Sequence, residues 1–466
     1  MQMEHCFIEG KPRIGRILKF ILPTYLTSLF TTLYTIIDGV FVSAYVGTNA
    51  LAAINIVYPI VNLLTGLSLM FAVGGSTLAA IALGSRSQSR ANHIFSQCLF
   101  WSLLLGIGTA AVCWLGLDAI LSFLGATAPT MEYCRTYALL WLLGVPAVVG
   151  KELLIYFIRI DGAPGLSFSI SAAGGIANIL LDALFVGVWD LGVFGAGLAT
   201  VMGLFLSCLL GIVRLLGQRS ALRITWQRPQ LTAAVQYGMN GSSELVNQLA
   251  IAVTTIVFNR TALDLAGEDA IAAVSIIMYL QFIFLGVYFG GSMGLSPLLG
   301  YAMGQGRPDL CRKLERYAHR FFLTAPVVLC GLALACAPAA VRLFSQNSHV
   351  CALAIRGMRL YSLGYLFAGL NIFTSLRLSS YGLGRRAAVI TGLRSCVLLL
   401  ASLAVLPRFW GLDGMWLAFP AAELGTLAAT LFFSRQCTIH IASCCQNAPA
   451  GEHQKSVSGS TAQDCG

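Results

Sequence analysis

Charged side chains are scarce in this chain. Only 10% of its 466 residues are Asp, Glu, Lys or Arg, 57% are hydrophobic, and the mean hydropathy is +0.79. Soluble domains carry charge on about 25% of their residues, so this composition excludes an ordinary protein that folds in water. It predicts a protein embedded in a lipid bilayer.

Motifs for enzyme chemistry, cofactor binding and structural metals are also missing. No nucleophile stands beside a general base, and the 14 cysteines form no paired C-x-x-C motif. The sequence shows no selectivity-filter motif and no ligand-binding ectodomain, which argues against a channel or a receptor. We therefore expect neither an enzyme nor a bound cofactor.

Long apolar runs are what the chain does contain. A helix of about 20 residues crosses the ~30 Å hydrocarbon core of a bilayer. The continuous apolar character of the runs predicts helices rather than the alternating strands of a membrane barrel. The expected spans are 17–45, 50–83, 93–117, 133–158, 166–189, 193–217, 232–258, 270–303, 317–344, 353–381, 387–407 and 411–434.

The second half of the chain repeats the first. The segment GTNALAAINI at 47–56 reappears as GEDAIAAVSI at 267–276, and LGSRSQSRAN at 83–92 reappears as MGQGRPDLCR at 303–312. A duplicated helical bundle is typical of secondary transporters. We predict an all-α membrane protein of twelve transmembrane helices in two six-helix lobes. Its expected parts are a cytoplasmic N-terminus (1–16), an N-lobe (17–217), a cytoplasmic linker (218–231), a C-lobe (232–434) and a disordered cytoplasmic tail (435–466).

Basic residues are unevenly distributed between the two sides of this predicted bundle. Most of the 29 Lys and Arg residues fall on the side of the N-terminus, and we assign Arg377 and Arg394 to that side as well. By the positive-inside rule, both termini are expected in the cytoplasm, with the chain in the inner cell membrane. The net charge of +10 is thus interpreted as an orientation signal and not as a sign of nucleic-acid binding.

Two carboxylates lie deep within spans of the first half. An acid at the centre of a transmembrane helix costs about 2.5–3.5 kcal/mol, so Asp38 and Asp182 each require an explanation. Asn178 precedes Asp182 by one helical turn and shares its face, and Thr200 lies on the next span, after a tight glycine-rich turn. Such hard oxygen ligands suit Na⁺ or a proton-bearing carboxyl. The alternative is that these groups only hydrogen-bond helices together.

The second half carries a sparser set of polar groups within its spans. Glu244 and Gln248 share one helix face at i, i+4 spacing. Glu244 fits a second proton site or a cationic-substrate pocket, but it also fits a solvated position near a helix end. Aromatic residues such as Tyr34 are candidates for lining a cleft that binds flat organic cations. The substrate-binding candidates are Tyr34, Glu244, Gln248, Gln281 and Asn371.

Lys151 and Glu152 are adjacent residues within the fourth span. Because neighbouring side chains point in different directions on a helix, we expect these two not to pair with each other. No partner for Lys151 follows from the sequence.

The order and spacing of these features resemble the multidrug and toxic compound extrusion (MATE) family, in its DinF-like branch. The resemblance covers residues 15–435. It is carried by Pro23 with DGVFV at 38–42, GTNALAA at 47–53, RIDGAP at 159–164, Asn178 with Asp182, and GVFGAGLAT at 192–200.

The resemblance implies two lobes related by a pseudo-two-fold axis along the membrane normal. It also implies export of organic, often cationic, compounds in exchange for H⁺ or Na⁺. Asp38, Asn178, Asp182 and Thr200 match the family's N-lobe cation site. Where some relatives carry an acid in the tenth span, this chain has the neutral Asn371, so we place coupling in the N-lobe.

The closest rival is a flippase for lipids or lipid-linked oligosaccharides with the same two-lobe architecture. A flippase predicts a strongly basic central cavity for phosphates, and within the spans only Lys151 favours it. We expect small organic molecules and the lipid bilayer as partners. Because each chain contains both lobes, we expect it to function as a monomer.

Overall fold

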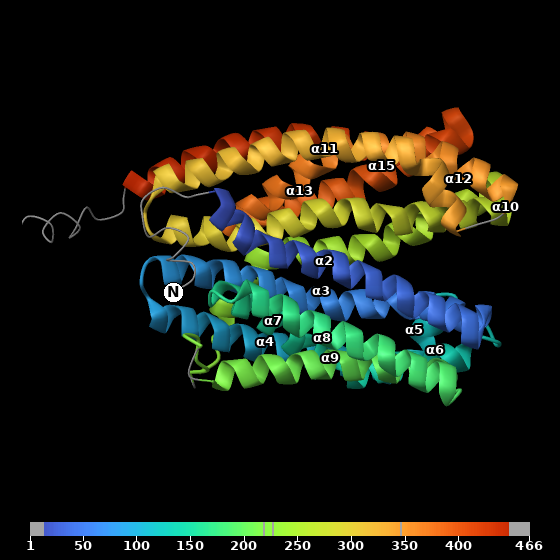
Figure 1. Cartoon of the computed structure of the whole chain (residues 1–466), viewed down its shortest axis with the longest axis horizontal. Helices are drawn as coiled ribbons and strands as arrows, with labels where there is room; N and C mark the ends of the chain where they lie inside the picture. Colours follow the sequence, from blue (N-terminus) through green and yellow to red (C-terminus); the bar gives the residue numbers. More distant parts are fainter. Residues whose placement is uncertain (1–13, 218–219, 226–227, 345–346, 447–466) are drawn as a thin grey trace, which may run out of the picture.

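The computed structural model describes the chain apart from residues 1–13, 218–219, 226–227, 345–346 and 447–466. All regular structure among the described residues is helical, as a bilayer requires, because a helix satisfies its own backbone hydrogen bonds. The helices run roughly parallel and form two lobes that lie side by side (Figure 1).

The N-lobe holds α2 to α9. Within it, α3 packs against α4 and α7, and α8 packs against α9. The bounds are α2 (Ile14–Phe41), the π-helical turn η1 (Val42–Val46), α3 (Thr48–Gly84), α4 (Gln88–Leu115), α5 (Leu117–Phe123), α6 (Met131–Leu143), α7 (Val145–Ile160), α8 (Pro164–Asp182), the π-helical turn η2 (Ala183–Val188) and α9 (Gly192–Leu216).

The C-lobe holds α10 to α15. Within it, α10 packs against α13 and α14, and α13 packs against α11 and α15, while α10 also lies along α2 and α3 of the N-lobe. The bounds are α10 (Leu231–Gly304), α11 (Pro308–Phe344), α12 (Ser348–Tyr361), the 3₁₀ turn η3 (Ser362–Gly364), α13 (Tyr365–Ser380), α14 (Gly384–Gly392), the π-helical turn η4 (Leu393–Val397) and α15 (Leu398–Gln446).

The predicted spans all coincide with these helices once breaks are taken into account. The backbone of α10 leaves helical geometry at Ala266 and Gly267, and that of α15 does so at Gly411, so each of these helices supplies more than one span. One span is bent by 53° between α6 and α7. The prediction of twelve transmembrane helices in two lobes is confirmed.

The backbone repeats as the sequence does. Glycines with positive φ end or join helices at matching places in the two lobes. The pairs are Gly47 (107°) with Gly267 (73°), Gly162 (85°) with Gly382 (78°), and Gly192 (56°) with Gly411 (54°). Left-handed φ favours glycine because it lacks a Cβ. The same turns are therefore built into both halves.

The two lobes meet closely at one end of the bundle, here called the closed end, which carries the turns at 85–87 and 305–307. A Cβ on Gly74 would lie 2.1 Å from the Tyr237 carbonyl oxygen, and one on Gly84 would lie 2.2 Å from that of Tyr301. Asn240 Nδ2 donates to Thr77 Oγ1 at 2.7 Å and also to the carbonyls of residues 74 and 379.

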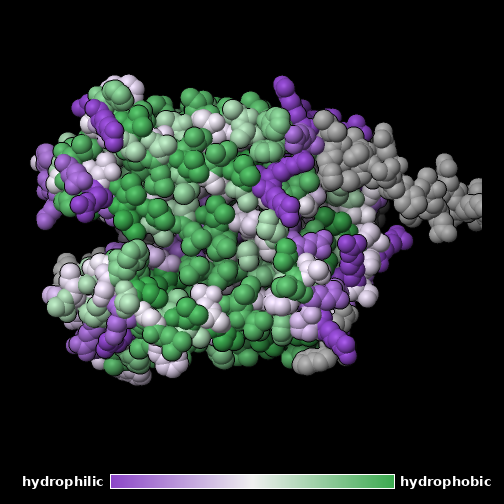
Figure 2. All heavy atoms as spheres, turned by 180° about the vertical axis from the view of Figure 1, so that it is seen from behind, coloured by the Kyte–Doolittle hydropathy of each residue, from purple (hydrophilic) through white to green (hydrophobic). Residues whose placement is uncertain are grey.

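The opposite end, here called the open end, carries the bend at Gly267. Figure 2 shows a hollow between the lobes at this end and a continuous apolar surface toward the closed end. Hydrophilic residues gather at both ends of the molecule, on either side of a largely apolar band (Figure 2). This distribution fits a bundle that crosses a bilayer with its long axis roughly along the membrane normal.

The chain beyond the expected end of the C-lobe at 434 is partly ordered. The last helix, α15, continues to Gln446, so residues 435–446 are helical and not a disordered tail. Residues 447–466 of that predicted tail, and residues 1–13 of the predicted N-terminal segment, lie outside the described residues.

Candidate functional site

Asp38 and Asp182 lie on neighbouring helices of the N-lobe. Asp38 is on α2, and Asp182 is the last residue of α8. The two helices approach closely at Gly175, where a Cβ would lie 2.6 Å from the Phe30 ring and 2.9 Å from the Tyr34 ring. The carboxyl groups of Asp38 and Asp182 are thereby brought close enough to interact electrostatically.

Asn178 and Thr200 join this pair from α8 and α9. Asn178 Nδ2 donates to Thr200 Oγ1 at 3.4 Å, and Thr200 Oγ1 donates to the Ala196 carbonyl at 3.0 Å. The α8–α9 contact is tight, since a Cβ on Gly174 would lie 2.6 Å from the Gly203 carbonyl oxygen. The structure thus groups the four residues that the sequence proposed, and we call them the N-lobe oxygen cluster.

Four side-chain oxygens of this cluster have no hydrogen-bond donor among the described residues. Asn178 is 3% exposed and Asp182 is fully buried. Among the described residues, no group donates a hydrogen bond to Asp38 Oδ1, Asn178 Oδ1 or either carboxylate oxygen of Asp182. A buried acceptor without a donor is costly. These acceptors are what a bound monovalent cation or a shared proton would satisfy.

Two π-helical turns flank the cluster. One, η1, begins directly after α2 ends at Phe41, and the other, η2, begins directly after Asp182. A π turn widens the helix and shifts its backbone hydrogen bonds by one residue, and such turns often occur at functional sites. Here they place irregular backbone directly after Asp182 and one helical turn after Asp38.

The prediction that Lys151 and Glu152 do not pair is wrong. Lys151 Nζ lies 2.6 Å from Glu152 Oε1 on α7, and both side chains are largely buried. Their Cβ atoms diverge on the helix, but both side chains are long and flexible enough to curve toward each other. Tyr34 of α2 lies within electrostatic range of this ion pair and of Asp38.

The five predicted substrate-binding residues fall into separate neighbourhoods. Tyr34 packs beside the N-lobe oxygen cluster. Glu244 and Gln248 lie on the part of α10 that faces α3, where Gln248 contacts Gly66. Gln281 accepts a hydrogen bond from the Tyr361 hydroxyl. Asn371 is fully buried within the C-lobe.

Sequence reasoning missed a polar network around Asn371. Its Nδ2 donates to Glu423 Oε2 at 2.7 Å, and its Oδ1 accepts from Thr430 at 2.7 Å. Arg394 Nη1 lies 3.1 Å from Glu423 Oε1. Glu423 is the sort of lone acid within an apolar span that drew attention to Asp38, so the same signal was present in the sequence.

A second buried ion pair in the C-lobe was also missed. Arg377 holds both carboxylate oxygens of Glu315, at 2.6 and 3.1 Å, and the Tyr381 hydroxyl donates to the same carboxylate at 2.9 Å. The sequence placed Arg377 and Arg394 with the loop charges at the cytoplasmic side. Both are buried side chains within the bundle, and each pairs with an acid on a neighbouring helix.

Comparison with known proteins identifies the family. The MatE family model matches residues 23–184 and 245–404, which is more than half of the chain. The multidrug export protein MepA of Staphylococcus saprophyticus is 23% identical over 434 residues, covering 91% of this chain and 94% of the relative. MepA of Staphylococcus aureus is 26% identical over the same length.

Solved structures agree on the fold. A MATE crystal structure in complex with MaL6 has a TM-score of 0.87 at 20% identity and covers 96% of this chain and 99% of its own. A MOP superfamily transporter from Pyrococcus furiosus has a TM-score of 0.85 at 20% identity, covering 95% and 98%. The DinF-like branch stays a prediction. The chain belongs to the MatE family, the multidrug and toxic compound extrusion transporters, and is therefore a membrane transporter and not an enzyme.

Proposed function

We propose that this transporter exports organic, often cationic, compounds in exchange for H⁺ or Na⁺, and that the N-lobe oxygen cluster binds the coupling ion. The observation that carries the proposal is the set of buried, donor-free oxygens on Asp38, Asn178 and Asp182. Thr200 completes the cluster as a hydroxyl ligand. No other cofactor is needed for exchange of this kind.

The energetics favour an exchangeable cation at this site. Two carboxylates about 4 Å apart repel by about 4 kcal/mol at an effective dielectric constant of about 20. A shared proton removes that repulsion, because one carboxyl then donates to the other. A Na⁺ ion between them also removes it and gains four or more oxygen ligands. The cluster is thus more stable with a cation than without one, and the ion gradient can act on it.

The conformation fits one state of an alternating-access cycle. We assign the closed end to the cytoplasm because most basic residues lie there, and the described chain begins and ends at that side (Figure 1). Both termini are then cytoplasmic, in the inner cell membrane, and the hollow in Figure 2 faces outward. Cation binding from outside favours substrate release, and loss of the cation inside lets the cleft bind substrate again.

Substrate contact is proposed at the face between the lobes. Tyr34 offers an aromatic ring beside the coupling site, and Glu244 offers a buried carboxylate that forms no ion pair within 4.0 Å among the described residues. Gln248 adds an amide one turn from Glu244. Gln281 and Asn371 are engaged by neighbouring side chains in this state, so their part would begin only after a rearrangement.

The flippase alternative loses its main support. Lys151 was the basic residue that favoured it, and its charge is neutralised by Glu152 at 2.6 Å. Export of small organic compounds is also what the names of the MepA relatives state for those proteins. Both lobes lie in one chain, so we propose a functional monomer.

The decisive experiment measures efflux of a fluorescent organic cation from vesicles that contain the purified protein. A Na⁺ gradient and a pH gradient are imposed separately, and each tenfold gradient supplies about 1.4 kcal/mol. Transport should follow one gradient and disappear in Asp38→Asn. A one-for-one exchange of monovalent cations moves no net charge, so an imposed membrane potential should leave the rate unchanged.

A matched control is Asp118→Asn. Asp118 pairs with Arg135 near the open end, and both side chains are more than half exposed, so the same chemical change removes an acid outside the cluster. It should transport as the unchanged protein does. Equal transport by Asp38→Asn would contradict the cluster assignment, and no transport under either gradient by correctly folded protein would contradict the antiport proposal.

A further inference from the structure

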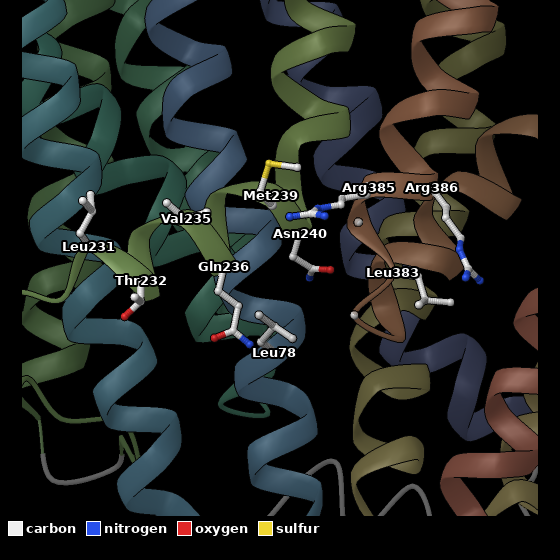
Figure 3. A pocket seen from close by; sticks show the side chains of 12 residues that line it. Leu78, Leu231, Thr232, Val235, Gln236, Met239, Asn240, Leu383, Arg385 and Arg386 are labelled. Atoms are coloured by element: carbon white, nitrogen blue, oxygen red, sulfur yellow. The ribbon is translucent and has the colours of Figure 1, made fainter.

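A cavity of about 670 Å³ lies at the closed end, apart from the N-lobe oxygen cluster. Its walls come from the first turns of α10, from Leu78 of α3 and from the turn that joins α13 to α14 (Figure 3). None of its lining residues belongs to the coupling site or to the proposed substrate contacts. The function derived above therefore gives this cavity no role.

One wall of the cavity is a striped face of α10. Leu231, Val235 and Met239 follow one another at intervals of four residues and are 67%, 54% and 37% exposed. Thr232 and Gln236 form a parallel polar stripe beside them. Residues four apart lie one above the other on a helix, so an apolar track about two turns long runs next to a polar one.

The facing wall is basic. Arg385 and Arg386 are the second and third residues of α14, next to the positive end of its backbone dipole. Figure 3 shows Arg385 extending toward α10 and Arg386 on the other side of the same turn. Neither side chain forms an ion pair or a hydrogen bond with the described residues, and the lining includes no acid.

The fold itself does not require these arginines. The equivalent turn of the N-lobe, after Gly162, leads into α8, whose second and third residues are Gly165 and Leu166. Both turns have a positive-φ glycine two residues before the helix begins, so the comparison is position for position. The C-lobe alone carries two cations here, and nothing in the repeat explains them.

We infer that this cavity binds an anionic phospholipid from the leaflet at the closed end. Arg385 holds the phosphate, Arg386 adds to the positive potential at the rim, Thr232 and Gln236 contact the headgroup, and an acyl chain lies along Leu231, Val235 and Met239. Basic pockets between helices at a membrane surface suit acidic headgroups. An acyl chain can pack on the exposed apolar track, whereas a free phosphate has no apolar group that could do so.

The bound lipid would also favour one conformation. Leu78 belongs to α3 of the N-lobe, whereas the other walls belong to the C-lobe. Separation of the lobes at the closed end would remove one wall of the cavity. An anionic lipid would therefore stabilise the closed arrangement in which Asn240 contacts Thr77. This inference does not depend on which ion drives transport.

The test measures binding of fluorescent phosphatidylglycerol to the purified full chain in a mild detergent. Unlabelled phosphatidylglycerol should displace the probe, while phosphatidylcholine should displace it at least tenfold less well and glycerol 3-phosphate should not displace it. Arg385→Gln with Arg386→Gln should weaken binding about thirtyfold, and Arg385→Gln alone about fivefold. Val235→Gln should weaken lipid binding by removing the apolar track.

The matched control is Arg312→Gln with Arg316→Gln, which removes the same charge from an exposed part of α11 outside the cavity. Binding to this variant should stay within about twofold. Arg385→Lys with Arg386→Lys keeps the charge and should retain most of the affinity, which separates binding from folding. Equal binding by the Gln pair and the control pair would overturn the inference. Displacement by glycerol 3-phosphate as effective as by the lipid would show a free-anion site instead, and would also overturn it.

Discussion

Two buried acids of the N-lobe and two of the C-lobe have different partners. In the N-lobe, Asp38 and Asp182 face each other, and neither has a basic partner among the described residues. In the C-lobe, Glu315 is held by Arg377 and Glu423 is held by Arg394. The lobes share a backbone plan, down to the positive-φ glycines that join their helices, and these acids differ in the side chains that face them.

This contrast separates a coupling role from a structural one. A buried carboxylate with a permanent arginine partner keeps the same net charge throughout a transport cycle, and it cannot release a cation without breaking that ion pair. A pair of carboxylates without an arginine must instead take its positive charge from solution. We therefore propose that an ion gradient acts on the N-lobe oxygen cluster, whereas Glu315 and Glu423, each held by an arginine, serve the fold.

The largest expected effect concerns transport and comes from the N-lobe. Asp182→Asn should reduce efflux to the level of protein-free vesicles, because the cluster loses the charge that attracts the coupling ion. Folding should be unaffected or improved, since the change removes repulsion with Asp38. Efflux and the midpoint of thermal unfolding in detergent, measured on the same preparation, check both parts. If Asp182→Asn transported normally, Asp182 would have no part in ion coupling, and the proposed difference in role between the acids of the two lobes would be wrong.

For Glu315→Gln in the C-lobe, we expect the main effect to be a loss of stability. The change leaves the guanidinium of Arg377 buried without its carboxylate, which should destabilise the protein by about 3–5 kcal/mol. Unfolding measurements in detergent test this, and Glu315→Leu combined with Arg377→Met should recover most of the loss. If Glu315→Gln were as stable as Asp118→Asn, which alters an exposed pair, the structural role would be wrong.

A smaller loss of stability is expected for Glu423→Gln, about 2–3 kcal/mol. Arg394 makes one contact with Glu423 and keeps two others, a hydrogen bond to Asn247 at 3.4 Å and a position over the Phe289 ring at 5.9 Å. The coupling ion should not change, so the variant that still folds should show the same gradient dependence as the unchanged protein. A switch in the driving ion would place part of the coupling site in the C-lobe.

The smallest effect is expected at a turn where the two lobes have the same backbone conformation but different residues. Arg86 has a φ of 59° where the matching turn of the C-lobe has Gly306 at 64°. A left-handed conformation costs a side-chain-bearing residue about 1–2 kcal/mol. Arg86→Gly should therefore raise the free energy of unfolding by up to about 1 kcal/mol, less the entropy that glycine adds to the unfolded chain. Gly306→Ala should do the reverse.

Much of this fold follows from the amino-acid sequence. The bilayer admits few spanning architectures, so long apolar runs predict helices well, and the repeated segments at 47–56 and 267–276 predict the two lobes. The N-lobe oxygen cluster is predictable too, since acids within apolar spans are rare and Asn178 lies one turn from Asp182 on the same helix face. The tertiary structure brings Asp38 and Thr200 to this face from other helices.

The C-lobe ion pairs were not predicted, for a physical reason. The positive-inside rule treats an arginine near the end of a span as exposed to water. Arg377 is instead buried against Glu315, which lies on a different helix, and the sequence does not show that these two residues meet. The partner of Arg394 lies 29 residues further along the chain, on another helix. The prediction that Lys151 does not pair with Glu152 was wrong. The flexible Lys151 side chain bends toward Glu152 although its Cα–Cβ bond points in a different direction.

The sequence by itself determined that this chain is a duplicated helical transporter with two uncompensated acids in its first half, because hydropathy, repetition and helical spacing are local properties of the chain. The tertiary structure alone decided which buried charges are neutralised, which end of the bundle is closed, and that Arg385 faces an apolar track on α10. These properties depend on contacts between helices far apart in sequence, and no local pattern records them.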